Sequence, residues 1–175
     1  MSLPTKILGK TGCKVTILGL GGEGILRTIG RYKEAEAVIK KAFEVGITYF
    51  DTAPAYEQSR DYLGNTLWQY VNREQIFLAS KTHDRSYEGT IFLLEDTLKR
   101  LKTNYLDLLQ LHDLRTKYDL EQIFSKNGAI HALVQAKKEG KIRFIGITGH
   151  HYPEILVKAI EMYDFDTVLL CVNAG

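Results

Sequence analysis

Four side chains with complementary acid–base chemistry are spaced along the first two thirds of the sequence: a carboxylate at Asp51, a phenol at Tyr56, an ammonium group at Lys81 and an imidazole at His112. Such a set suits the reduction of a carbonyl group, because a hydride arriving at carbon builds negative charge on oxygen, which must then receive a proton. Tyr56 would donate this proton. A free phenol has a pKa near ~10, and an adjacent ammonium group such as Lys81 would lower it by stabilising the phenolate.

The other two side chains would support this transfer. Asp51 would pair with Lys81, fixing the ammonium group and keeping it protonated. His112 would donate a hydrogen bond to the substrate oxygen and orient it. Taken singly, each residue has an ordinary structural explanation, such as a turn, a packing aromatic ring or a polar residue at a core boundary. The functional interpretation is favoured because all four are expected on the same face of one βα array.

The elements that must position these residues are short, continuously apolar runs. They comprise residues 47–50, 76–80, 106–111, 144–147 and 167–172. Unbroken apolar runs are typical of strands covered on both faces, as in a parallel sheet. Residues 51, 81, 112 and 148 follow four of these runs at intervals of about 30 to 36 residues, the length of a βα unit. Adjacent strands lie ~4.8 Å apart, so the polar residues that end three successive strands would converge within roughly 10 Å.

Helical periodicity fills the gaps between the runs. Apolar residues at helical spacing predict a helix beginning near Lys33 and ending before Gly46, and others over residues 91–101 and 130–134. Pro153 is expected in the first turn of a further helix. Before the array, residues 5–8 and 13–17 flank a glycine-rich turn, which predicts a β-hairpin placed to cover one end of a barrel.

A glycine-rich stretch, Gly19-Leu20-Gly21-Gly22-Glu23-Gly24, follows the apolar residues 15–18 and satisfies the G-x-G-x-x-G pattern of dinucleotide-binding folds. In that fold the third glycine opens a helix whose N-terminus meets the pyrophosphate, whereas the next helix here is expected only near Lys33. We therefore expect these glycines to let the backbone bend at the carboxyl end of the first parallel strand, close to a ligand.

Three segments of the sequence resemble the signature segments of the aldo-keto reductase family: Phe50-Asp51-Thr52-Ala53-Pro54-Ala55-Tyr56, Ala79-Ser80-Lys81-Thr82 and Leu109-Gln110-Leu111-His112. The resemblance implies a single α/β domain over residues 1–175, a (β/α)8 TIM barrel with an N-terminal β-hairpin. It implies reduction of a small aldehyde or ketone with NADPH, with Asp51, Tyr56, Lys81 and His112 as catalytic residues. The candidate cofactor contacts are Gly22, Asp51, Thr148, His150 and Asn173.

The sequence departs from the family in two respects. The family typically has Ser-Asn after the fifth strand and a glutamine on the sixth, whereas this chain has Thr148-Gly149-His150-His151 and no glutamine in residues 166–172. The histidine pair resembles a divergent branch, some of whose members carry additional C-terminal domains. A complete barrel takes about 250 residues, and only about six βα units fit here. We expect the chain to continue beyond residue 175, and the barrel as given to bind NADPH poorly.

Composition excludes several other classes of protein. The chain is 45% hydrophobic and 25% charged, as in ordinary globular proteins, with a net charge of only +2. Near neutrality predicts no nucleic-acid partner, and no apolar run reaches the ~20 residues of a membrane span. Without a secretory signal, a cytoplasmic location is expected. The two cysteines, Cys13 and Cys171, have no metal-binding spacing and are predicted to be buried thiols; the oligomeric state is not predicted.

Two alternative functions remain open from the sequence. Four histidines, at positions 83, 112, 150 and 151, fall just beyond predicted strand ends, where a metal-dependent barrel hydrolase would place ligands. No acidic ligand accompanies them, so no metal site is predicted. A regulatory subunit that binds nucleotide without turnover is the second alternative, because fold alone does not establish activity.

Overall fold

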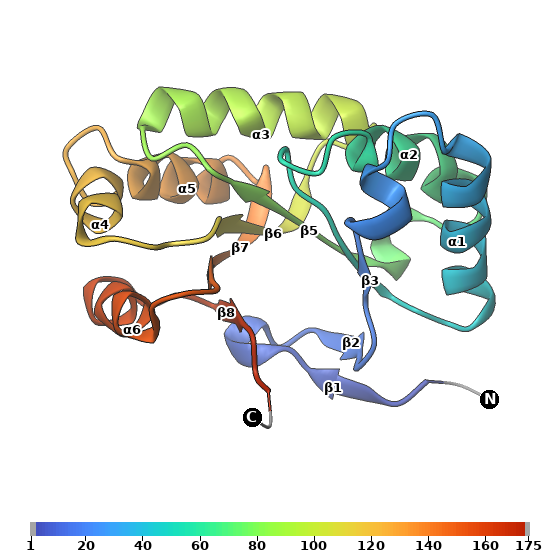
Figure 1. Cartoon of the computed structure of the whole chain (residues 1–175), viewed down its shortest axis with the longest axis horizontal. Coiled ribbons are helices and arrows are strands. Elements are labelled where there is room, and N and C mark those ends of the chain that lie inside the picture. Colours follow the sequence, from blue (N-terminus) through green and yellow to red (C-terminus); the bar gives the residue numbers. More distant parts are fainter. Residues whose placement is uncertain (1–2, 174–175) are drawn as a thin grey trace.

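The computed structural model describes residues 3–173, whose centre is a curled, six-stranded parallel sheet (Figure 1). Its strands are β3 (Leu20–Gly21), β4 (Tyr49–Asp51), β5 (Phe77–Thr82), β6 (Leu106–Leu111), β7 (Ile142–Gly149) and β8 (Thr167–Leu170). Their order in the sheet is their order in the chain, so each strand pairs with its successor. Every residue of β5 and β6 is buried, which agrees with the parallel sheet predicted from continuous apolar runs.

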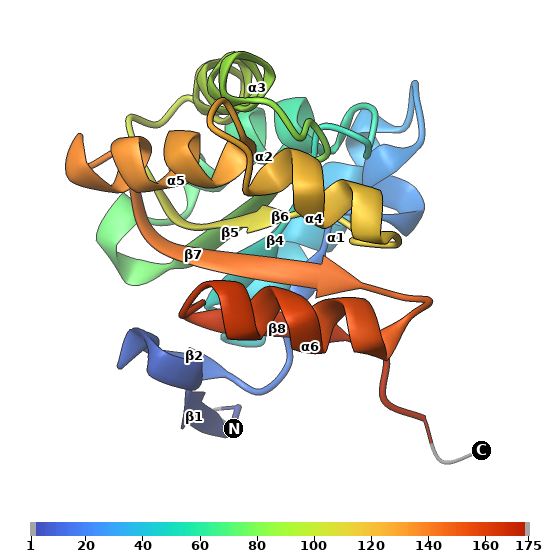
Figure 2. The ribbon, with the colours of Figure 1, turned by 90° about the vertical axis from the view of Figure 1, so that its left-hand side faces the viewer.

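Helices cover the convex face of the sheet (Figures 1 and 2). They are α1 (Tyr32–Glu44), α2 (Ser59–Thr66), α3 (Tyr87–Leu101), α4 (Lys117–Ile123), α5 (Ala129–Lys138) and α6 (Pro153–Met162), with 3-10 turns η1 (Gly9–Thr11), η2 (Gly24–Arg27), η3 (Leu67–Gln69) and η4 (Arg73–Gln75). In α1 the buried residues Ala35, Ile39 and Ala42 form one helical face. Gly46, at φ +84°, follows the end of this helix as predicted.

The core has two layers. The larger lies between the sheet and its helices, and a smaller one lies inside the curl, where Val15 packs with Phe77, Ala79 and Leu108. Val15 belongs to the predicted N-terminal hairpin, in which β1 (Thr5–Ile7) pairs antiparallel with β2 (Lys14–Thr16). The Tyr49 and Phe77 rings stack in the same layer at 5.3 Å. Phe77 begins β5, so the hairpin covers the amino-terminal end of the sheet interior.

The structure corrects several sequence-based expectations. Residues 15–18 are not the first parallel strand; β2 ends at Thr16, and the glycine stretch itself supplies β3. Asp51, Lys81 and Thr148 lie within their strands instead of after them. One expectation is confirmed: Gly24 opens only a 3-10 turn, and the next α-helix begins at Tyr32, so the glycines do not form a dinucleotide fingerprint. Cys171 is exposed and Cys13 half-buried, so the prediction of buried thiols is wrong.

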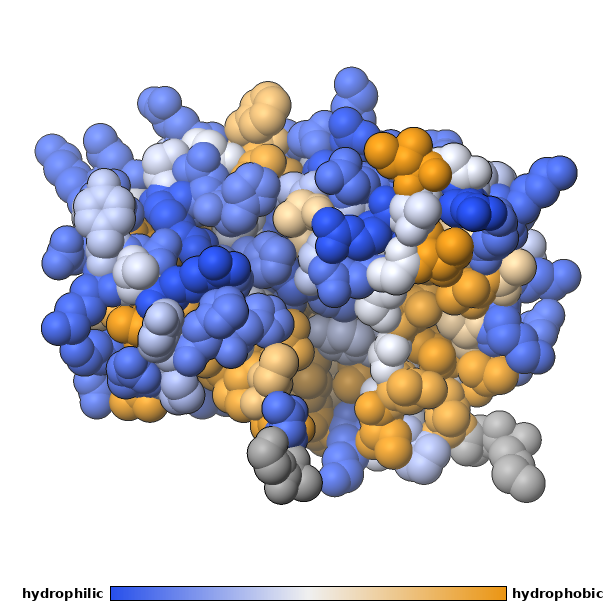
Figure 3. All heavy atoms as spheres, viewed as in Figure 1, coloured by the Kyte–Doolittle hydropathy of each residue, from blue (hydrophilic) through white to orange (hydrophobic). Residues whose placement is uncertain are grey.

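The edge strand β8 leaves apolar side chains exposed. Figure 3 shows hydrophobic residues gathered in the lower half of that view, around a hollow, whereas the upper half is mostly hydrophilic. The exposed large hydrophobic residues include Ile7 of the hairpin, Ile17 and Leu18 of the segment after it, and Leu169 and Leu170 of β8. Across residues 3–173, no helix has both the length and the apolar composition needed to cross a bilayer.

Candidate active site

The carboxyl ends of three neighbouring strands carry three of the predicted residues. Asp51 is the last residue of β4, Lys81 lies near the end of β5, and His112 directly follows β6. The strands are in register, with Asp51 beside Ala79 and Lys81 beside Gln110, and the His112 N–H donates to the Thr82 carbonyl at 2.9 Å. The parallel ladder therefore brings these residues to one rim of the sheet, as the sequence predicts.

Lys81 forms the centre of the site. Its ammonium group, in a side chain only 2% exposed, donates to both carboxylate oxygens of Asp51 and to the Thr52 carbonyl at 3.1 Å. The same nitrogen lies 4.7 Å from the centroid of the Tyr56 ring. Lys81 thus contacts two of the three other predicted residues.

Tyr56 reaches the site from the loop after β4. The Tyr56 N–H donates to the Ala53 carbonyl at 3.0 Å, so the loop turns back toward the strand end. The Thr52 hydroxyl donates to the Ser59 hydroxyl at 2.9 Å and ties the loop to the start of α2. The rings of Tyr56 and His112 meet edge to face, with their centroids 5.9 Å apart. All four predicted catalytic residues are therefore close together.

Burial dominates the electrostatics of these groups. It raises the pKa of the Tyr56 phenol, and the ammonium group of Lys81 opposes that rise without reversing it. The sequence-based expectation of a net lowering is therefore wrong. Burial, with the charge of Lys81, lowers the pKa of His112 to about 4, so this imidazole is neutral at neutral pH. Burial also raises the pKa of Asp51, against the opposing effect of Lys81.

An open cavity of about 490 Å³ adjoins the site and runs along the inside of the curled sheet. Asp51, Tyr56 and Lys81 line it together with Gly22. A Cβ at Gly22 would lie 2.4 Å from the Ser59 hydroxyl oxygen and 2.8 Å from the Asp51 carbonyl oxygen. Close packing against the Asp51 strand end therefore requires a glycine at this position, whether or not a ligand binds there.

The remaining predicted cofactor residues lie elsewhere. The Thr148 hydroxyl is buried and accepts a hydrogen bond from the Asp113 N–H at 2.7 Å. His150 lines a second cavity, of about 200 Å³, between α6 and β8, where its Nδ1 is 3.4 Å from the sulfur of Cys171. Asn173 is exposed beyond the end of β8. The structure thus groups Gly22 and Asp51 around the first cavity and separates the other three from it.

Sequence reasoning did not single out two polar residues that line the cavity, Tyr49 and Glu23. Tyr49 lies two positions before Asp51 on β4, so strand alternation places both on the inner face. Glu23 directly follows Gly22, and its negative charge raises the pKa of Tyr56 and Asp51 slightly further. The alternation along residues 49–51 was a signal that could have identified Tyr49.

The strand-end histidines do not form a metal site. Within residues 3–173, no three His, Cys, Asp or Glu side chains are grouped so that they could hold a metal ion. His112 is directed toward Tyr56, while His150 and His151 follow β7 and lie beside the second cavity. This placement gives no support to the metal-dependent hydrolase alternative.

Comparison with known proteins agrees with this fold. The family model described as "Aldo/keto reductase family" matches residues 17–174. The chain belongs to the aldo-keto reductase family.

Three similar proteins illustrate the relationship. L-galactose dehydrogenase of Arabidopsis thaliana is 37% identical over 155 residues, covering 82% of this chain and 48% of that protein. The holo form of aldo-keto reductase AKR11C1 from Bacillus halodurans superimposes with a TM-score of 0.83 at 25% identity, covering 97% of this chain and 58% of that one. A Bombyx mori aldo-keto reductase in complex with NADP gives 0.79 at 20% identity, covering 99% and 59%. The chain spans about half the length of the curated relatives it matches.

Proposed function

We propose that this chain carries the catalytic residues of an NADPH-dependent oxidoreductase that reduces a small aldehyde or ketone to an alcohol, with Tyr56 as the proton donor. The observation that carries the proposal is the contact of Lys81 with Asp51 and with the Tyr56 ring at one rim of a parallel sheet. Membership of the aldo-keto reductase family supports it. The sheet would then be the first six strands of an eight-stranded barrel.

The assignment of Tyr56 as donor follows from the protonation states of the site. Its raised pKa keeps the phenol protonated at neutral pH, the form that can give a proton to a nascent alkoxide. Once the proton has left, the ammonium group of Lys81 stabilises the phenolate. His112, with a pKa of about 4, lacks the second proton and donates a hydrogen bond from a neutral N–H instead. His112 therefore orients the substrate oxygen, and Tyr56 protonates it.

The residues around the cavity fit a nicotinamide cofactor in part. Asp51 and Gly22 line the cavity next to the donor set, and Thr148, His150 and Asn173 remain proposed contacts. Reduced nicotinamide, when bound, supplies the hydride. The described residues contribute the proton, the orientation of the carbonyl oxygen and an apolar wall that includes Leu20, Tyr49 and Leu169. The NADP complex of the Bombyx mori protein supports this choice of cofactor.

Turnover of NADPH with a panel of small aldehydes and ketones tests the proposal, measured on a polypeptide that includes the strands needed to close the barrel. The panel includes L-galactose with the oxidised cofactor, because one relative carries that substrate in its name. Tyr56→Phe removes the donor and is expected to lower the rate by about 10² to 10⁴-fold. Tyr70→Phe, on an exposed ring, is the matched control and should leave the rate unchanged. NADPH binding without turnover of any carbonyl would favour the regulatory-subunit alternative, and equal rates for wild type and Tyr56→Phe would refute the donor assignment.

A further inference from the structure

We infer that Arg85 is a positioning residue for His112, holding the backbone that carries the imidazole at the mouth of the site. This inference rests on the proposed function, in which His112 orients the substrate oxygen. Arg85 lies three residues after β5, the strand of Lys81, and bridges to the end of β6, where His112 follows. It therefore links the two strand ends that carry the ammonium group and the imidazole.

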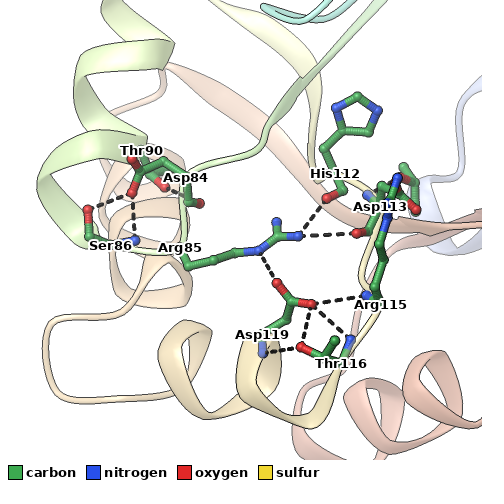
Figure 4. A network of polar contacts seen from close by, with 10 residues as sticks. Asp84, Arg85, Ser86, Thr90, His112, Asp113, Arg115, Thr116 and Asp119 are labelled. Carbon is green, nitrogen blue, oxygen red and sulfur yellow. Dashed lines mark hydrogen bonds and ion pairs between the residues drawn. The ribbon is translucent and has the colours of Figure 1, made fainter.

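The guanidinium of Arg85 makes three directed contacts (Figure 4). Its Nη2 donates to the carbonyl of His112 at 2.8 Å and to the carbonyl of Asp113 at 3.2 Å. Its Nε donates to Oδ1 of Asp119 at 2.9 Å. Figure 4 shows the imidazole pointing away from the guanidinium, so Arg85 acts on the backbone of His112 and does not touch the reacting atoms.

Asp119 is itself held firmly on α4. Its Oδ2 accepts hydrogen bonds from the Arg115 N–H at 3.1 Å, the Thr116 N–H at 2.8 Å and the Thr116 hydroxyl at 2.9 Å. The Thr116 hydroxyl oxygen in turn accepts a hydrogen bond from the Asp119 N–H at 3.1 Å. This bond completes a capping box at the start of α4. The anchor of Arg85 is thus part of a rigid helix terminus.

The backbone that Arg85 holds adopts a left-handed conformation. Asp113, directly after His112, has φ +52°, in the region that residues other than glycine, asparagine and aspartate rarely occupy. Arg85 binds its carbonyl, and the Thr148 hydroxyl accepts a hydrogen bond from its N–H at 2.7 Å. A strained residue persists only where its surroundings fix it. Loss of the Arg85 contacts should let this turn relax and displace the His112 ring.

A second arginine at the opposite end of the sheet provides the matched control. Arg73 also bridges two segments, donating to the carbonyls of Ile76 and Tyr105, both at 3.2 Å, and pairing with the buried Asp107 at 2.7 Å. It has the same chemistry and comparable burial, but its acceptors lie at the amino ends of β5 and β6. If Arg85 contributed only to overall stability, Arg85→Met and Arg73→Met would have the same effect on the position of the His112 ring.

The test is the ¹H–¹³C correlation of the His112 ring in the whole chain, which needs no turnover. Because the centroids of the Tyr56 and His112 rings are 5.9 Å apart, the ring current of Tyr56 makes the His112 signals sensitive to small displacements. Arg85→Met is expected to shift these signals and to speed amide exchange at Asp113 and Leu114 by about tenfold or more. Arg85→Lys and Asp119→Asn, which keep part of the network, should give intermediate shifts. Arg73→Met should leave the ring signals in place.

The outcomes separate this inference from the proposed function. His112 signals that superimpose on wild type in Arg85→Met or, if that variant does not fold, in Arg85→Lys would overturn the positioning role, whatever the activity. Displaced signals with unchanged turnover in Tyr56→Phe would support the positioning role and refute the proposed function. In an active protein, Arg85→Met should lower kcat/KM by about tenfold and Arg85→Lys should restore most of it.

Discussion

The ammonium group of Lys81 donates to both carboxylate oxygens of Asp51 inside the protein, and the Thr52 carbonyl accepts a further hydrogen bond from it at 3.1 Å. Moving two charges out of water is costly, so a buried ion pair is weak evidence of a contribution to stability. The role that the geometry favours for the pair is to hold a positive charge beside the Tyr56 ring, 4.7 Å from its centroid.

Breaking this pair on one side should destabilise the fold. Asp51→Asn leaves a buried ammonium group without its counter-ion, and we expect a loss of about 3 kcal/mol in the free energy of unfolding, measured by urea denaturation. The double variant Asp51→Asn/Lys81→Met, which removes the unpaired charge, should recover part of this loss. Lys41→Met breaks an exposed pair with Glu44 and should change stability little. Wild-type stability of Asp51→Asn would contradict the burial argument.

The lowered pKa of His112 predicts a specific pH dependence of stability. The unfolded chain takes up a proton at this residue near the ordinary value of 6.5, whereas the folded chain does so only near about 4. The contribution of His112 is therefore complete above pH 6.5, declines as the pH falls to about 4, and is constant below that. Urea denaturation at several pH values should show a shallower decline in His112→Gln than in wild type, with His131→Gln on the exposed face of α5 as the control. Parallel curves for wild type and His112→Gln would rule out this assignment.

Two neighbouring glycines distinguish packing from ligand contact in the glycine-rich stretch. A Cβ at Gly22 would lie 3.0 Å or less from atoms of Ser59, Asp51 and Thr52, whereas a Cβ at Gly21 meets nothing within 4 Å. Gly22→Ala should therefore lower the free energy of unfolding by about 1 to 3 kcal/mol, the usual cost of overpacking, and Gly21→Ala should leave it nearly unchanged. Thermal and urea denaturation of both variants would reveal this difference. Equal stability of the two variants would mean that the loop after β4 can move to accommodate the new Cβ at little cost in free energy.

The regular elements were predictable because each has a strong local signal. Continuous apolar runs mark the strands β4 to β8. Gly46 follows the end of α1, and Pro153 is the first residue of α6. Strand ends were set too early, because Asp51, Lys81 and Thr148 are polar but still take part in the sheet ladder. Helix α2 was not predicted, since its sequence, Ser59–Thr66, contains few apolar residues at helical spacing and is held by tertiary packing.

The sequence predicted which residues form the site, but it did not predict the direction in which the pKa of Tyr56 shifts. Strand spacing and the family resemblance identified the residues that meet at the rim, because parallel strands end at one edge. The sign of the pKa shift of Tyr56 depends on how deeply its ring is buried, and tertiary packing alone decides that. The role of Arg85 was not predictable either. Arg85 donates to the backbone carbonyl of His112, 27 positions away, and no pattern in the sequence indicates such a contact.

As long as no further strand pairs with β8, the open edge of the sheet predicts self-association of the 175-residue polypeptide. Strand β8 pairs with β7 on one side only, and it exposes Val168, Leu169 and Leu170 by about 40 to 50% each. Unpaired backbone groups beside apolar side chains favour pairing with another edge, and a charge on such a strand opposes it.

Val168→Lys should therefore reduce the concentration-dependent rise in mass seen by light scattering. Phe92→Lys is the matched control, because Phe92 is 70% exposed but lies on α3, away from both edges. An equal effect of both variants would mean that general surface hydrophobicity, and not the open edge, drives association. A wild-type chain that stays monomeric at every concentration would show that its edge is already protected, by local twist or by the apolar face of α6.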